Sequence, residues 1–158
     1  MATTVVKSNL TVTVTESYTL NGVAYGNTMN KTYETNGQVS QRVMSVAGSR
    51  VGETTNVFTT ILSLRTIDAK GQVVRADYKY FRITNLDTVN TLNLRFFNNV
   101  DYVAVKVLPS SSFLLMDNGI DTPANATSAL AIADIYDIVG QSSSTSDAID
   151  VEFIMVTE

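Results

Sequence analysis

The fold of this 158-residue chain is decided by the stretch Ala76–Met116, in which three segments alternate apolar and polar residues. The segments read Tyr78-Lys-Tyr-Phe-Arg-Ile83, Leu92-Asn-Leu-Arg-Phe-Phe97 and Tyr102-Val-Ala-Val-Lys-Val107. A period of two is typical of β-strands with one buried face. Leu92, Leu94 and Phe96 are therefore expected to share one side of a strand. The stretch predicts a β-meander at the centre of an antiparallel core.

Similar strands are predicted before and after this stretch. Leu10-Thr-Val-Thr-Val-Thr15 places apolar residues on one face and threonines on the other, and Tyr18 and Leu20 continue the apolar phase. Asn21-Gly22 is a strong hairpin signal because both residue types tolerate positive φ, so a strand should return from Val23 to Tyr33. A second pair, Asn36-Gly37, predicts another hairpin into Val39–Val46. Ala148–Thr157 is the last predicted strand, with its apolar residues in one phase.

The chain as a whole is predicted to be all-β, with about 8–10 strands at the spacing typical of an antiparallel β-sandwich. A jelly-roll-like sandwich is the leading expectation. The predicted organisation is an N-terminal arm, residues 1–8, followed by a single sandwich domain, residues 9–158. Residues 119–133 are rich in small side chains and are expected to form a long loop, with one helical turn near its end. The polar stretch 141–146 is expected to be disordered.

Composition excludes several classes of function. The net charge is -4 and the eleven Lys and Arg residues are scattered, which argues against nucleic-acid binding because phosphate recognition needs clustered positive charge. No segment has the ~20 apolar residues that span a membrane. No apolar run near the start suits a signal peptide, so synthesis in the cytoplasm is expected. Charged residues are only 16% of the chain, and the resulting Thr- and Asn-rich surface suits packing against other protein.

The chain has no cysteine and no histidine, so disulfides, thiolate nucleophiles, Ser-His-Asp triads and histidine metal sites are excluded. Paired carboxylates are the remaining catalytic possibility. The candidates are Asp117 with Asp121, Asp134 with Asp137, and Asp150 with Glu152. Loop oxygens of Asp117, Asn118, Asp121 and Asp137 are the candidates for calcium. Turn positions and a polar strand face account for most of these residues, so no catalytic, cofactor-binding or metal site is predicted.

Tyrosines raise the alternative of sugar binding. The chain has seven, Tyr18, Tyr25, Tyr33, Tyr78, Tyr80, Tyr102 and Tyr136, and no tryptophan. Most are in phase with core residues, which predicts sheet tyrosines with the hydroxyl at the rim. A sugar-binding function would need exposed tyrosines grouped together.

Three strings carry a resemblance to a known class of protein: Leu10-Thr-Val-Thr-Val-Thr-Glu-Ser-Tyr-Thr-Leu-Asn-Gly22, Tyr80-Phe-Arg-Ile-Thr-Asn-Leu-Asp87 and Ser110-Ser-Ser-Phe-Leu-Leu115. Together they resemble the small β-sandwich structural proteins of tailed bacteriophages, over residues 9 to 157. The strings are strand and turn patterns, so they transfer no functional residue.

The resemblance implies a non-enzymatic virion protein, with a capsid decoration or cement protein as the leading role. The implied partners are the major capsid protein or other virion proteins, and a homo-oligomer, as a trimer. A tail, neck or fibre component and a carbohydrate-binding (receptor-binding) sandwich are the alternatives. Residues 1–8 and 119–133 are the segments expected to contact a neighbouring subunit or the shell.

Overall fold

The computed structural model describes residues 8–35, 39–48, 58–65, 73–74, 78–98, 102–116 and 135–157. Within these ranges the chain is all-β and has no helix, as predicted. The strands are β1 (Ser8–Leu20), β2 (Val23–Thr35), β3 (Val39–Val46), β4 (Thr59–Arg65), β5 (Val73–Val74), β6 (Tyr78–Asn85), β7 (Leu92–Phe97), β8 (Tyr102–Val107), β9 (Ser112–Met116), β10 (Asp137–Ser142) and β11 (Ile149–Thr157). No helix in the described ranges is long and apolar enough to cross a membrane.

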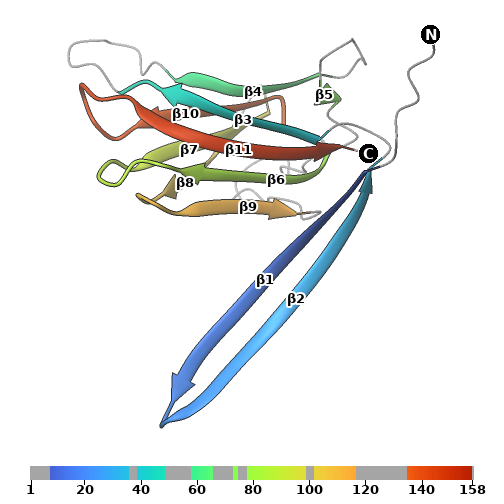
Figure 1. Cartoon of the computed structure of the whole chain (residues 1–158). Coiled ribbons are helices and arrows are strands. Elements are labelled where there is room, and N and C mark those ends of the chain that lie inside the picture. The colour runs from blue at the N-terminus through green and yellow to red at the C-terminus, as the bar shows by residue number, and fades with distance from the viewer. Residues whose placement is uncertain are drawn as a thin grey trace, which may run out of the picture.

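Two sheets form the body of the molecule, and a separate two-stranded hairpin projects from it (Figure 1). One sheet has the order β3-β11-β6-β9 and the other β5-β4-β10-β7-β8. All strand pairs in the described ranges are antiparallel except the short parallel pair of β4 and β5, and an isolated parallel bridge joins Gly48 to Ser142. The predicted antiparallel β-sandwich is confirmed.

The strand order is that of a jelly roll. From β3 onward, leaving the two-residue β5 aside, the chain changes sheet at every connection except the β7–β8 hairpin. This path places β11 between β3 and β6, and β10 between β4 and β7. The last two strands therefore fill the middle of the two sheets, as in the two Greek keys of a jelly roll.

The core lies between the sheets and is built by the predicted alternation. Leu92, Leu94 and Phe96 of β7 are buried, and Asn93 and Arg95 point outward. On β11 the residues Ile149, Val151, Phe153 and Met155 are all buried. Phe81 lies between the rings of Phe96 and Phe153, with centroids 6.2 and 6.3 Å away. Such ring pairs add to the area-proportional gain of burial.

The predicted meander is wrong. β6 belongs to one sheet, whereas β7 and β8 form a hairpin in the other, and β9 returns to the first sheet. The connection from β6 to β7 crosses the end of the sandwich and is held by Asn85, a completely buried side chain. Its Nδ2 donates to the carbonyls of Asn90, Val107 and Leu108 at 2.8, 3.2 and 3.3 Å. Alternation predicts a buried face but does not say which sheet a strand joins.

Two further expectations about loops are wrong. No β2–β3 hairpin forms, because β3 pairs with β11; the Asn36-Gly37 pair itself lies outside the described residues. The stretch 141–146 is ordered, with Gln141 and Ser142 buried. The Ser144 hydroxyl accepts from the backbone N–H groups of Ser146 and Asp147 at 3.3 and 2.9 Å. Serine in such a sequence closes a turn through local hydrogen bonds. The predicted arm and the loop 119–133 lie outside the described residues, except Ser8, which begins β1.

Candidate functional site

The projecting hairpin is the feature that sets this chain apart from a plain sandwich. β1 and β2 pair without a break over 13 residues each, from Ser8 opposite Thr35 to Leu20 opposite Val23. At the tip, Asn21 and Gly22 have φ values of 50° and 79°, the conformation of a type I′ turn. The predicted turn is confirmed. No other strand in the described ranges exceeds nine residues, so the hairpin extends well beyond the sandwich (Figure 1).

The hairpin has two unlike faces, because side chains alternate along each strand. One face is polar, and its side chains form hydrogen bonds between the two strands. The hydroxyls of Thr11 and Thr32 lie 3.1 Å apart, and the Thr13 hydroxyl donates to Asn30 Oδ1 at 2.8 Å. The other face is mainly apolar, and we call it the apolar hairpin face. It carries the pairs Leu10·Tyr33, Val12·Lys31, Val14·Met29, Glu16·Asn27, Tyr18·Tyr25 and Leu20·Val23.

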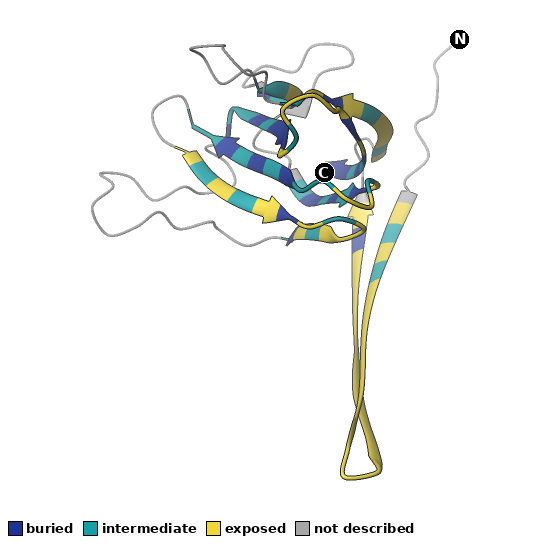
Figure 2. Cartoon of the chain, turned by 90° about the vertical axis from the view of Figure 1, so that its left-hand side faces the viewer, coloured by how far each residue is buried: buried dark blue, intermediate teal, exposed yellow. Residues whose placement is uncertain are grey.

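Most of the apolar hairpin face is open to solvent, as the yellow ribbon in Figure 2 shows. Tyr18 and Leu20 are 59% and 57% exposed. The rings of Tyr18 and Tyr25 stack, with centroids 5.4 Å apart and planes at 15°. The other exposed apolar side chains are Val14, Val23 and Met29. Together the six residues expose roughly 600 Å² of surface, at the upper end of the range for the largest apolar patch on a typical monomer.

The base of the hairpin is anchored to the sandwich by a second, smaller apolar cluster. Tyr33 of β2 packs with Tyr80 and Val156 on the outer side of the sheet β3-β11-β6-β9. The Tyr33 and Tyr80 rings lie 5.9 Å apart. Burial raises the pKa of the Tyr80 hydroxyl, and the charge of Arg82 opposes that shift. Since these base residues face the body, the apolar hairpin face continues outward from an existing apolar contact.

An open groove of about 510 Å³ lies where the hairpin leaves the sandwich. Residues 10–15 of β1 line one side, and the outer face of the sheet lines the other through Tyr80, Arg82, Ser112, Leu114 and Ile154. Val14 and Leu114 are 36% and 40% exposed there. The groove is thus the inner end of the apolar hairpin face.

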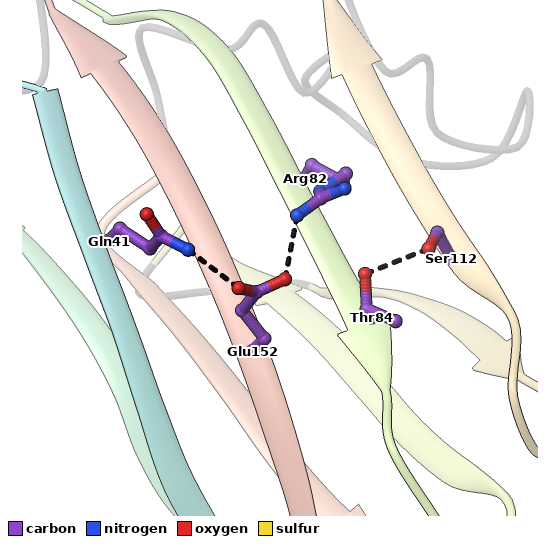
Figure 3. A network of polar contacts seen from close by, with 5 residues as sticks. All are labelled: Gln41, Arg82, Thr84, Ser112 and Glu152. Atoms are coloured by element: carbon purple, nitrogen blue, oxygen red, sulfur yellow. Dashed lines mark hydrogen bonds and ion pairs between the residues drawn. The ribbon is translucent and has the colours of Figure 1, made fainter.

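A polar network crosses the outer face of the sheet beside this groove (Figure 3). Glu152 accepts from Gln41 Nε2 at 2.6 Å through one carboxylate oxygen and from Arg82 Nη2 at 2.7 Å through the other. Thr84 of β6 and Ser112 of the neighbouring strand β9 share a hydrogen bond of 2.8 Å. Both oxygens of Glu152 are therefore engaged in fixing the sheet surface, which leaves the carboxylate poorly placed to act as a base or nucleophile.

The structure describes only part of the predicted carboxylate set. Asp117, Asn118, Asp121 and Asp134 lie outside the described residues. Asp137 accepts a hydrogen bond of 2.6 Å from Ser63 on the neighbouring strand. Asp150 is exposed and shares the outer side of β11 with Glu152. Among the described residues, no three His, Cys, Asp or Glu side chains are grouped closely enough to hold a metal ion.

Tyr33 and Tyr80 are buried sheet tyrosines as predicted, although the Tyr33 hydroxyl is itself buried and not at the rim; the prediction is wrong for three others. Tyr102 is 49% exposed, but its ring is covered by the guanidinium of Arg95, whose Cζ lies 4.4 Å from the centroid. Tyr18 and Tyr25 have the same phase as Tyr33, and yet they lie two residue pairs from the turn and are exposed. They form the exposed aromatic pair near the hairpin tip.

Comparisons with protein-family models, with curated proteins and with solved structures find no match.

Proposed function

We propose that this chain is a non-enzymatic structural protein of a bacteriophage virion, and specifically a capsid decoration or cement protein bound to the head shell. The observation that carries the proposal is the projecting hairpin, which holds a mainly apolar face in solvent, interrupted by the Glu16·Asn27 row. A large exposed apolar patch on a folded protein marks a surface that another molecule covers. An assembly role accounts for this surface better than a catalytic role does.

The remaining chemistry supports the same conclusion. The jelly roll is a fold of viral capsid domains and also of lectins, so the fold alone does not distinguish these two functions. The molecular surfaces must distinguish them. On the outer face of the sheet, Glu152 is held by Gln41 and Arg82. This network fixes the side chains on the outer face of the sheet, so the surface offered there is ordered.

The proposed partners are the major capsid protein or other virion proteins, together with further copies of this chain. Residues 1–8 and 119–133 are proposed to contact the shell. The resemblance implies a trimer, whereas the hairpin itself favours a two-fold contact, and the mass of the purified chain in solution decides between the two. The site of action is the virion, after synthesis in the host cytoplasm.

Copy number in purified particles tests the proposal. Quantitative mass spectrometry of this chain against the major shell protein should find hundreds of copies for a decoration protein. A handful of copies would instead assign the chain to the neck, tail or fibre. Complete absence from the particle would overturn the virion role.

Binding to shells locates the contact. A variant lacking residues 1–8 should keep the β-sandwich, as judged by its circular dichroism and unfolding transition, and should no longer sediment with shells. A matched variant shortened at its C-terminal residue, Glu158, is the control and should bind normally. Unchanged binding of the first variant would remove residues 1–8 from the shell contact.

A carbohydrate-binding, receptor-recognising module is the second candidate, and the stacked Tyr18–Tyr25 pair favours it. Exposed aromatic rings stack on the apolar faces of sugars, but neither Tyr18 nor Tyr25 lines the groove at the base of the hairpin. A glycan array distinguishes the two functions. A reproducible signal that Tyr18→Ala abolishes would favour the sugar-binding module, whereas a decoration protein should give none.

A further inference from the structure

The apolar hairpin face has four free rows of residue pairs beyond its anchored base. They are, from base to tip, Val14·Met29, Glu16·Asn27, Tyr18·Tyr25 and Leu20·Val23. An isolated two-stranded ribbon is only marginally stable in water, because it has one layer and nothing to bury its apolar side. The free rows therefore need a second layer of protein to cover their apolar side chains.

We propose that a second copy of this chain supplies that layer, laid face to face and antiparallel across a two-fold axis between the Glu16·Asn27 and Tyr18·Tyr25 rows. In this register the end rows meet each other, so Val14 and Met29 pack against Leu20 and Val23 of the second copy. Each middle polar row meets a tyrosine row. Apolar rows therefore face apolar rows, and each polar row faces the hydroxyls of a tyrosine row, along the whole contact.

The middle rows are chemically matched in this arrangement. Facing β-layers lie about 10 Å apart, a distance that a tyrosine side chain nearly spans. The Tyr18 and Tyr25 hydroxyls of one copy would then reach the Glu16 carboxylate and Asn27 amide of the other. A hydroxyl donating to a carboxylate gives one of the stronger hydrogen bonds. A polar row that interrupts an apolar face is thereby satisfied, where a purely apolar partner would leave it unpaired.

The antiparallel direction follows from the anchored base. Leu10, Val12 and Tyr33 face the outer side of this chain's own sandwich, so the body occupies the space above the base rows. A parallel second hairpin would place its own base and body in that same space. In the antiparallel arrangement only a narrow hairpin tip approaches the body, where the groove of about 510 Å³ lined by Val14 and Leu114 is open to receive it.

The buried area is sufficient for a specific dimer. Covering roughly 600 Å² on each copy removes about 1,200 Å² in total, the lower end of the range for stable specific interfaces. Insertion of each tip into the groove adds to that figure. The inference does not depend on the virion role, since it concerns the purified chain alone.

Sedimentation equilibrium of the purified full chain tests the contact. Two variants are compared, one with aspartates on the apolar face of the hairpin tip and one with aspartates on its polar face. The chain should sediment with twice its 17.2 kDa monomer mass. Leu20→Asp with Val23→Asp should weaken the dimer by about 100-fold or more, because the interface would bury unpaired charge. The matched control, Thr19→Asp with Ala24→Asp, puts the same charges on the polar face one pair away and should leave the dimer intact. A monomer for the unmodified chain, a trimer, or equal effects of the two double variants would overturn the proposal.

Thiol cross-linking tests the register, since the chain contains no cysteine of its own. Val14→Cys and Leu20→Cys are prepared as separate proteins, mixed and treated with an oxidant or a short bis-maleimide. The mixture should give a covalent dimer, and each variant alone should give little. Cross-linking of Leu20→Cys with itself would place the tips together and overturn the antiparallel arrangement. A mixture that sediments as a dimer without cross-linking would overturn the register.

Discussion

Replacing Tyr33 by alanine should release the hairpin from the sandwich without unfolding the sandwich. Tyr33 is 5% exposed and belongs to the anchoring cluster with Tyr80 and Val156. The main core between the sheets is a separate cluster and contains none of these three residues. Loss of the ring should therefore weaken the attachment of β1 and β2 and leave the other strands in place.

The size of the effect follows from the buried area. A buried tyrosine covers about 150–250 Å², and at about 25 cal/mol per Å² the upper limit for losing the ring is near 4–6 kcal/mol. Aromatic-to-alanine changes in cores cost about 3–5 kcal/mol. Because this cluster lies at the edge of the molecule, where solvent fills part of the space left behind, we expect about 3 kcal/mol.

Native-state hydrogen exchange measures this effect segment by segment. Amides of residues 8–20 and 23–35 should exchange about 100-fold faster in Tyr33→Ala, since 1.4 kcal/mol corresponds to a tenfold change. Amides of β6 and β11 should be unaffected. The comparison is made in the Leu20→Asp, Val23→Asp background, so that protection from a second copy does not mask the result.

Tyr33→Phe is the control, because it keeps the ring and should retain most of the hairpin protection. Two results would refute the reasoning. If β6 and β11 lose protection together with the hairpin, the two clusters form one cooperative unit. If the hairpin amides do not change, Tyr33 is not the anchor.

Two further predictions concern the connection that crosses the end of the sandwich. Asn85→Ala should destabilise the chain by about 3 kcal/mol in urea unfolding, because a fully buried side chain loses its hydrogen bonds to the carbonyls of Asn90, Val107 and Leu108. Thr84→Ala, which removes an exposed hydroxyl contact, should cost less than about 1 kcal/mol, and equal costs of the two variants would contradict this explanation. The backbone N–H groups of Asn90 and Val89 hold the pKa of Asp87 below its ordinary value of 3.8, so its contribution to stability is full above that value and is lost as the pH falls below it. Asp87→Asn should therefore flatten the loss of stability on the acid side, and an unchanged pH profile would show that Asp87 has no such role.

Local signals in the sequence were sufficient for the strands and for the hairpin turn. The alternation of Leu92, Leu94 and Phe96 predicted which residues are buried, and Asn21-Gly22 predicted a tight turn with two positive φ values. The jelly-roll-like sandwich followed from the number and spacing of strands. These features depend on interactions within a few residues, which a sequence displays directly.

The arrangement of strands between the sheets was not predictable in the same way. The Asn85–Asp87 segment has the composition of a hairpin turn, but the buried Asn85 amide binds carbonyls from Val107 and Leu108, more than 20 residues away. Asparagine signals a turn and does not indicate which backbone its side chain will reach. The ordered turn at Ser144 was missed for a related reason, since polar composition alone does not separate a disordered loop from one that bonds to itself.

The hairpin is the clearest case in which the alternation in the sequence does not match the burial of the residues in the structure. The apolar phase from Leu10 to Leu20 is broken only at Glu16, and otherwise follows the same alternation as β11, whose apolar residues in that phase are buried in the core. On the hairpin only the first residues of that phase reach the sandwich, and Tyr18 and Leu20 remain exposed. An alternation with a period of two predicts that one face of a strand is buried, but it does not indicate which part of the protein or which partner buries that face. Where the chain itself leaves such a face open, the regularity of the pattern argues that the cover is another molecule, and the matched rows of this hairpin argue that it is a second copy of the same chain.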